Sequence, residues 1–356
     1  MIRFTWRQFR GQATVAGIGL AVVAIVLAIT GSHLAHLYDT TVATCATHGD
    51  CDAATGNLLG ADKFLQTALN VLVLVLPGLL GVFWGAPLIA GELEAGTFRL
   101  AWAQSVTRTR WITCKLGLVG LASMVVSGLF SLMVTWWFSP IDLVQANRLS
   151  SSIVFGARDI VPIGYAAFAF VLGASAGAII RRTLPAMATT LVSFVVARIV
   201  FTTLIRPRLI APLHRGFALD PNATGFGSSG SPLSGAGHAA LQPNPPDIPN
   251  GWIYSTDIID KAGRPLTSQV LKSDCPLLGT SGPPAGGTHS RSEVPNGVQH
   301  VLHDCVVKVG TTYHGVATYQ PGSRYWYFQW SETAIFLGAA IVLAGLCFWW
   351  VRRRVT

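Results

Sequence analysis

The chain has few charged residues for its length. Charged side chains make up 12% and apolar side chains 51% of its 356 residues, whereas soluble domains usually carry about 25% charged residues. So few charges cannot cover the surface of one large water-soluble globule. The composition therefore excludes that class and favours several membrane spans.

The sequence also lacks the patterns that carry chemistry. It contains no Walker A sequence, so this chain cannot hold nucleotide phosphates in a loop of that kind. No serine, histidine and carboxylate grouping stands out as a catalytic site. The closest metal-type grouping is His300, His303 and Cys305, and a disulfide at Cys305 would remove its thiolate. We predict no enzymatic activity, no metal site and no cofactor on this chain.

The net charge of +9 is compatible with nucleic-acid binding only if the basic residues form a stripe. They lie instead at the ends of apolar runs, where basic residues set the orientation of membrane spans. We therefore exclude nucleic acid as a partner.

Six apolar runs are long enough to cross a hydrocarbon core, which takes about 20 helical residues. The first is too long for a signal-peptide core and has no convincing small-residue cleavage site, so we expect it to be retained. The sequence predicts an α-helical integral membrane protein with six transmembrane helices, at residues 13–34, 64–90, 116–138, 160–180, 185–205 and 333–351.

The distribution of lysine and arginine predicts that both chain ends are cytoplasmic. With that orientation, the cytoplasmic segments hold Arg3, Arg7, Arg10, Arg99, Arg108, Arg110, Lys115, Arg181, Arg182, Arg352, Arg353 and Arg354. The two short outer loops hold only Lys63, Arg148 and Arg158. The long segment after the fifth run carries further basic residues, but segments of that length cross membranes largely regardless of charge.

The cysteines divide in the same way. Cys45 and Cys51 fall in the first outer loop, and Cys275 and Cys305 fall in the long outer segment. Pairs on the oxidising side predict two disulfides, Cys45–Cys51 and Cys275–Cys305. Cys114 and Cys347, at the inner ends of spans, are expected to be single thiols.

The predicted organisation has four parts. Residues 1–11 form an amphipathic interfacial helix, or else an ordinary basic flank of the first span. Residues 12–205 hold five transmembrane helices, and residues 332–356 hold the sixth with a basic tail. Residues 206–331 form an extracytoplasmic, disulfide-containing domain, with an irregular loop at 216–250 and strands within 301–318. Aromatic residues at 325–330 suit a membrane interface.

Two features inside the spans call for an explanation. Glycines 81, 85, 91, 173 and 177 have the small-residue spacing that lets helices approach closely. Arg198 is a lone charge in the fifth span, which is costly in hydrocarbon. It is a candidate for binding an anionic substrate group or for an ion pair with Asp142, Asp159 or Glu332; alternatively, it extends its charge to the interface.

The segment at residues 92–115 concentrates charge and tryptophan between two spans. Gly96 can end one helix and Thr97 can cap the next. A helix from Phe98 would place Phe98, Trp102 and Val106 on one face, as an interaction patch. The alternative is a helix lying flat on the inner leaflet.

This segment resembles the first cytoplasmic loop of ABC-2 type transporter permeases. That loop typically reads Glu-x-Glu-x-Gly-Thr, then a Leu-containing helix, a small polar or proline step, an Arg and a downstream Lys. The matching residues here are Glu92, Glu94, Gly96, Thr97, Leu100, Arg108 and Lys115, while Ser105 stands where many members have proline. The sequence Arg-Leu-Ala-Trp-x-Gln-Ser-Val-Thr-Arg and the stretch at 319–326 are similar to actinobacterial members.

The resemblance implies a permease subunit of an ABC exporter in the plasma (inner) membrane of a bacterium. A separate ABC ATPase subunit would bind ATP and Mg and engage the coupling residues Glu92, Glu94, Gly96, Thr97, Phe98, Arg99, Trp102, Arg108 and Arg110. A second permease chain, identical or homologous, would complete the pathway for an amphiphilic, lipid-like or drug-like substrate. The alternative is a non-transport membrane sensor whose outer domain binds an envelope ligand.

Overall fold

A computed structural model describes residues 2–45, 51–96, 107–145, 148–149, 151–220, 225–229, 238–243, 248–267, 269–270, 273 and 296–354. The chain divides into two compact units. The helical unit comprises Met1–Ile210 and Ser323–Thr356, and the strand unit comprises Ala211–Gly322. The predicted domain at residues 206–331 thus corresponds to a unit that is shorter at both ends.

Among the described residues, six helices are long and apolar enough to cross a membrane, which is the predicted number. They extend from Phe9 to Val42, Lys63 to Glu94, Thr109 to Trp137, Val161 to Ile180, Thr183 to Arg208 and Gly322 to Arg353. Most are longer than the apolar runs, because polar flanks continue the helix beyond the hydrophobic stretch.

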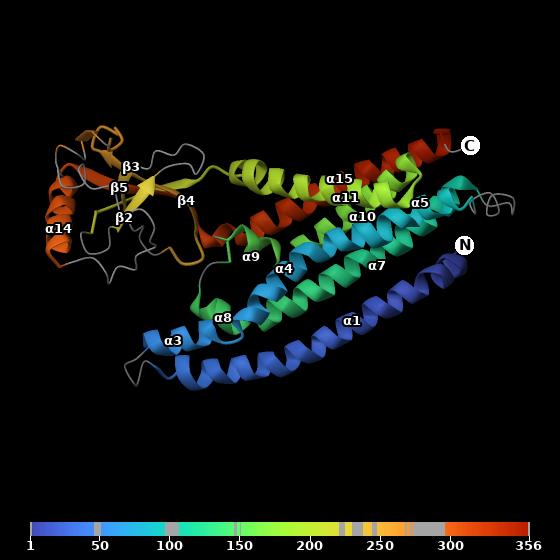
Figure 1. The fold of residues 1–356 in the computed structure, drawn as a ribbon, viewed down its shortest axis with the longest axis horizontal. Coiled ribbons are helices and arrows are strands. Elements are labelled where there is room, and N and C mark those ends of the chain that lie inside the picture. The colour runs from blue at the N-terminus through green and yellow to red at the C-terminus, as the bar shows by residue number, and fades with distance from the viewer. Residues whose placement is uncertain are drawn as a thin grey trace. The chain divides into compact units, whose positions relative to one another are not determined.

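These spans are built from the following elements (Figure 1): α1 (Ile2–Leu37) with η1 (Tyr38–Val42); α4 (Lys63–Leu80), η2 (Gly81–Gly85) and α5 (Ala86–Glu94); α7 (Arg108–Trp137); α10 (Val161–Ile180); α11 (Thr183–Val200) with η3 (Phe201–Ile205) and η4 (Arg206–Arg208); and η6 (Gly322–Arg324) with α15 (Tyr325–Arg354). Three short helices connect them: α3 (Cys51–Gly60), α8 (Ser139–Val144) and α9 (Ser152–Gly156). The residues of the predicted interfacial helix form the first turns of α1.

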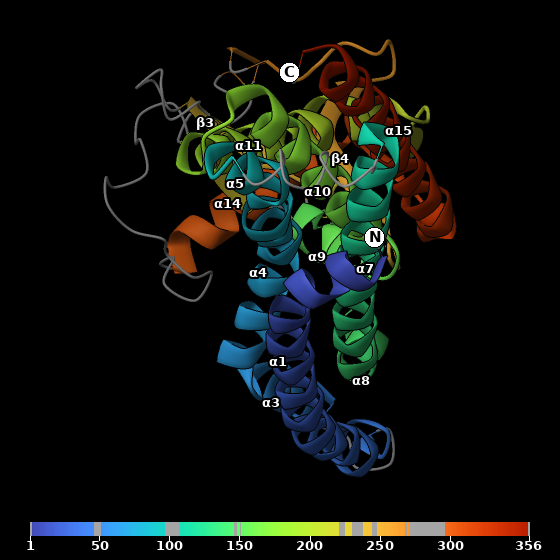
Figure 2. The same ribbon diagram turned by 90° about the vertical axis from the view of Figure 1, so that its right-hand side faces the viewer.

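The helix α10 is the centre of the helical unit. It packs against α4, η2, α5, α7, α11 and α15, and Figure 2 shows it among these helices. Its sequence is rich in alanine and glycine, and most of its residues are buried. By contrast, α1 packs chiefly on α7 and leaves Val15, Ile18, Val22 and Ile29 more than half exposed. Such an apolar surface is typical of a helix that faces lipid or another apolar chain.

Glycines allow the second span to touch α10 at its backbone. A Cβ atom at Gly81 would lie 2.4 Å from the Ala169 carbonyl oxygen, and one at Gly173 would lie 2.3 Å from the Gly81 carbonyl oxygen. Gly85 and Gly177 make similar approaches. The predicted packing role of these four glycines is therefore a contact within the chain, whereas a Cβ at Gly91 would meet nothing within 4 Å.

A disulfide between Cys45 and Cys51 joins the end of the first span to the start of α3, with the two Cα atoms 5.1 Å apart. This is the predicted bridge. Cys114 and Cys347 are free thiols, as expected. Cys305 is also disulfide-bonded, and its predicted partner, Cys275, lies outside the described residues.

In the strand unit, an antiparallel sheet has the order β1–β5–β4, formed by β1 (Leu213–Phe217), β5 (Tyr313–Gln320) and β4 (Trp252–Asp260). The strands β2 (Gly225–Ser229) and β3 (His238–Gln242) pair as a separate hairpin. The core cluster of this unit contains Leu219, Leu241, Ile258, Cys305, Val306 and Val309.

Two local predictions for this unit were wrong in part. Residues 216–250 include the end of β1 and the β2–β3 hairpin rather than only an irregular loop. Within 301–318, residues up to Gly310 belong to the helix α14 (Asn296–Gly310), and only β5 is a strand. The valines within 301–310 suggested a strand there, but the β propensity of a residue is only a weak preference. Cys305, Val306 and Val309 instead follow helical spacing and bury one face of α14.

A compact turn closes β4. The Asp260 carboxylate accepts hydrogen bonds from the backbone N–H groups of Ala262 (2.8 Å) and Arg264 (2.9 Å), and from Nε of Arg264 (2.8 Å). The Arg264 backbone N–H makes the largest contribution to lowering the pKa of Asp260 below its ordinary value.

This turn is expected to weaken in acid. The folded carboxyl gives up its proton at a lower pH than the unfolded one, so its stabilisation is complete above the unfolded pKa of about 3.9 and is lost as pH falls below it. Hydrogen-exchange protection of the Ala262 and Arg264 amides should therefore be lower at about pH 3 than at pH 7. Asp260→Asn should lose this pH dependence; an equal fall in that variant would assign it to another group.

Candidate functional site

The first turns of α1, the end of α5, the start of α7 and the end of α15 lie at the same end of the helical unit (Figure 1). Phe9, Ile89, Trp111 and Val351, from α1, α5, α7 and α15, share one buried cluster there. We call this the basic end, because the described residues of the predicted cytoplasmic segments gather at it. They include the exposed side chains of Arg7, Arg10, Arg110, Arg181, Arg182, Arg352 and Arg353. Folding thus brings four sequence segments of the same charge together.

The described edges of the 92–115 segment have defined helix ends. Helix α5 ends at Glu94, and Gly96 has a positive φ of 69°, as predicted for a helix stop. At the other edge, the Thr107 side chain caps α7 by accepting a hydrogen bond from the Arg110 backbone N–H at 3.4 Å. Local sequence therefore fixes where the segment leaves and enters the helices.

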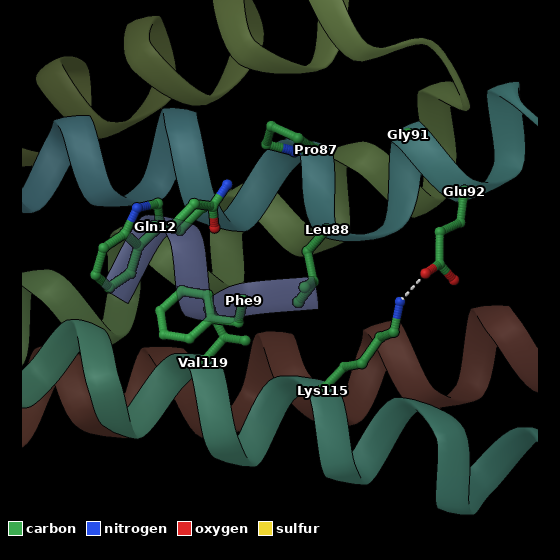
Figure 3. Close-up of a pocket in the computed structure, with 9 residues that line it drawn as sticks. Phe9, Gln12, Pro87, Leu88, Gly91, Glu92, Lys115 and Val119 are labelled. Atoms are coloured by element: carbon green, nitrogen blue, oxygen red, sulfur yellow. Dashed lines mark hydrogen bonds and ion pairs between the residues drawn. The ribbon is translucent and has the colours of Figure 1, made fainter. Parts of the chain in front are cut away.

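Glu92 forms an ion pair with Lys115, between α5 and α7 (Figure 3). The side chain of Lys115 is 3% exposed and that of Glu92 is 15% exposed. The Lys115 ammonium also lies 4.9 Å from the centre of the Trp111 ring. A buried ammonium without a carboxylate would be strongly unfavourable, so this pair holds the two edges of the segment together.

Glu94 connects the segment to the junction between α10 and α11. Its carboxylate accepts hydrogen bonds from the Thr183 backbone N–H (2.9 Å) and from the Thr183 hydroxyl (2.7 Å). Thr183 is the first residue of α11, where unpaired backbone N–H groups and the helix dipole favour a negative charge. Arg181 ends α10 with a positive φ of 60°. The segment is thus tied to three helices.

The structure places only part of the predicted coupling set. Glu92, Glu94 and Gly96 lie at the first edge, and Arg110 is exposed on the first turn of α7. Arg108 is the first residue of α7, and nothing is described of its side chain. Thr97, Phe98, Arg99 and Trp102 lie outside the described residues. Two roles at this site were not predicted: Lys115 as the ion-pair partner of Glu92, and Thr183 as the hydrogen-bond partner of Glu94.

A second polar cluster joins η4, α10 and α15 toward the opposite end of the helices. Arg206 contacts both carboxylate oxygens of Glu332, with Nε at 3.0 Å from Oε2 and Nη2 at 3.1 Å from Oε1. The Tyr165 hydroxyl donates to the same carboxylate. Both charged side chains are at most 1% exposed. Sequence analysis missed Arg206, because its position just after an apolar run indicated an ordinary basic flank.

Arg198 lies beside this cluster but has a different partner. Its guanidinium carbon is 3.7 Å from the centre of the Tyr165 ring, a cation–π contact. The three carboxylates proposed for it are bonded elsewhere: Asp142 to Arg148 at 2.8 Å, Asp159 to the Tyr325 hydroxyl, and Glu332 to Arg206. Its predicted role in binding an anionic substrate group remains a prediction.

Six long apolar helices among the described residues, with the buried ion pairs Glu92–Lys115 and Arg206–Glu332 between helices, define a multi-pass helical membrane protein. The model of the family named ABC-2 membrane transporter related matches residues 17–206, which is more than half of the chain. The chain belongs to this family. The match covers most of the first span, the next three spans, nearly all of the fifth and the 92–115 segment. No curated protein and no solved structure matched the chain.

Proposed function

We propose that this protein is the permease subunit of an ABC exporter and that residues 92–115 receive the motion of a separate ATPase subunit. The observation that carries this proposal is the anchoring of the segment by Glu92–Lys115 and Glu94–Thr183 in a chain of the ABC-2 related family. An exposed loop without such contacts would move by itself. A loop tied to α5, α7 and α11 would move these helices with it.

The distribution of charge supports a cytoplasmic position for the basic end. Short cytoplasmic segments carry an excess of lysine and arginine, and the described basic segments share this end. An ATPase that uses cytoplasmic ATP and Mg would meet the segment there. We place the protein in the plasma membrane of a bacterium, with the strand unit on the outer side, where the Cys45–Cys51 disulfide also suits an oxidising compartment.

The proposed transport step is a change between two packed arrangements of the helices. ATP binding to the partner would favour one of two packed arrangements of the helices, and the anchored segment would transmit the preference. A second permease chain, identical or homologous, would supply the other wall of the pathway. The apolar exposed surfaces of the spans favour an amphiphilic, lipid-like or drug-like substrate, and the outward direction rests on the family.

The alternative is a membrane sensor whose strand unit binds an envelope ligand. It is favoured by the size of that unit, Ala211–Gly322, which a minimal permease does not need. An ABC ATPase reading frame beside this gene would favour the transporter, and its absence would favour the sensor.

The coupling proposal is tested by co-purification from the native host in gentle detergent, followed by mass spectrometry. The wild-type chain is expected to retain an ABC ATPase in stoichiometric amount. Trp102→Asp is expected to lose most of it, because a charge would enter the apolar patch of Phe98, Trp102 and Val106, where aromatic anchors dominate binding and cost about 2–4 kcal/mol when removed.

The matched control is Gln104→Asp, which adds the same charge on the opposite face of the predicted helix and should keep the ATPase. Equal loss in both variants would contradict the patch and indicate a general charge effect. A wild-type chain that purifies without any ATPase would overturn the transporter proposal itself.

A further inference from the structure

A cavity of about 230 Å³ lies beside the Glu92–Lys115 pair, between α1, α5 and α7 (Figure 3). Phe9 and Gln12 line it from α1, Trp84 and Gly91 from the second span, and Lys115 from α7. Phe9 and Trp84 meet edge to face, with ring centres 4.8 Å apart. Three spans of the helical unit therefore contribute walls to a single space.

The polarity of the lining changes along the spans. Glu92 and Lys115 lie near the basic end, where α5 stops and α7 begins. Trp84 lies eight residues before Glu92 and Val119 four residues beyond Lys115, which places them about 12 Å and 6 Å deeper along their helices. The cavity thus has a charged end at Glu92 and Lys115, toward the membrane interface, and a mainly apolar end deeper in the span, where Gln12 is the polar side chain in the lining (Figure 3).

The charge in the cavity is balanced. The carboxylate of Glu92 faces the ammonium of Lys115, and they form an ion pair in the lining. An ionic ligand would bring an uncompensated charge to this pair and would have to be desolvated. An uncharged hydrogen-bonding group can meet the pair without that cost, and a hydrocarbon body gains from contact with Phe9, Trp84 and Val119.

We propose that this cavity binds an uncharged amphiphile, with its hydroxyl, amide or ester group at the Glu92–Lys115 pair and its hydrocarbon body against Trp84 and Val119. Its depth and its orientation match those of an amphiphile in the inner leaflet. The binding is a property of the helical unit and stands whether or not an ATPase engages the segment.

Gly91 provides the test. It lines the cavity, and a Cβ atom there would meet nothing within 4 Å. Gly91→Leu should therefore fill the space while favouring the helix, because leucine is a better helix former than glycine. Gly117→Leu is the matched control: Gly117 lies on the exposed face of α7, has the same free space and does not line the cavity.

The full-length protein in lipid nanodiscs is labelled with a diazirine derivative of octanol, and the modified residues are mapped by mass spectrometry. Labelling of Trp84 and Val119 is expected in the wild type and in Gly117→Leu. In Gly91→Leu it should fall by about tenfold, the change that a loss of roughly 1.4 kcal/mol of binding free energy produces. Unchanged labelling in Gly91→Leu, or label confined to lipid-facing residues such as Ile18, would overturn the proposal.

A second arm identifies the source of the ligand. Nanodiscs that contain diacylglycerol with a diazirine in its acyl chain are labelled in the same way. Labelling of Trp84 and Val119 that Gly91→Leu abolishes would identify a bilayer lipid chain as an occupant. Labelling by the octanol derivative alone would identify a free amphiphile. Because neither readout requires transport, failure here is distinguishable from failure of the proposed function.

Discussion

Glu332→Gln is expected to destabilise the helical unit strongly. It would leave the guanidinium of Arg206, which is 1% exposed, without its carboxylate. Removing one partner of a buried pair typically costs about 3–5 kcal/mol, because the remaining charge stays buried and uncompensated. Thermal unfolding of the detergent-solubilised protein should show a clear fall in Tm.

Two further variants separate this cause from others. Asp62→Asn makes a similar carboxylate-to-amide change at an exposed residue whose positive φ of 50° asparagine tolerates, and it should leave Tm nearly unchanged. The double variant Arg206→Met with Glu332→Met should recover most of the loss, since an apolar pair needs no compensation. If Glu332→Gln alone melted like the wild type, the pair would not contribute to stability as argued.

Gly173→Ala is expected to lower the free energy of unfolding by about 1–3 kcal/mol, the usual cost of overpacking a tight contact. Its Cβ atom would lie 2.3 Å from the Gly81 carbonyl oxygen and 2.8 Å from the Ala86 backbone nitrogen. Both neighbours are backbone atoms, which cannot rotate away as a side chain would. The second span and α10 would therefore have to move apart.

The control for this prediction is Gly117→Ala, where nothing lies within 4 Å of the new atom. Alanine favours helix over glycine by about 1 kcal/mol, so this variant should be as stable as the wild type or more so. Opposite changes in Tm for the same substitution would demonstrate the close approach. Equal changes would show that α10 and the second span have room between them.

The lengths of the apolar runs predicted the number of spans, because crossing a hydrocarbon core requires about 20 apolar helical residues wherever the helix packs. The distribution of the cysteines predicted Cys45–Cys51, since these two fall together in one outer loop of the predicted topology. The helix stop at Gly96 was predictable from the residue type, because glycine has no side chain and adopts a positive φ without steric cost. The family resemblance identified the 92–115 segment from residues that are adjacent in the chain.

The pairing of charges was not predictable in this way. Arg198 and Arg206 both flank or enter the fifth span, and the sequence alone suggested Arg198 as the partner of a carboxylate. The π-helical turn η3 (Phe201–Ile205) lies between them, and a wider turn changes the face on which the following residues lie. Arg206 consequently meets Glu332, while Arg198 stacks on Tyr165.

The sequence by itself determined what depends on length and local chemistry: the six spans, the helix ends at the 92–115 segment and the first disulfide. The tertiary structure alone decided which helices touch and through which residues. Glu94 bonds to Thr183, 89 residues away, and the cavity takes its walls from three spans. Such contacts depend on the rotation and depth of each helix against its neighbours. Packing of the whole unit sets this rotation and depth, and hydrophobic periodicity does not encode them.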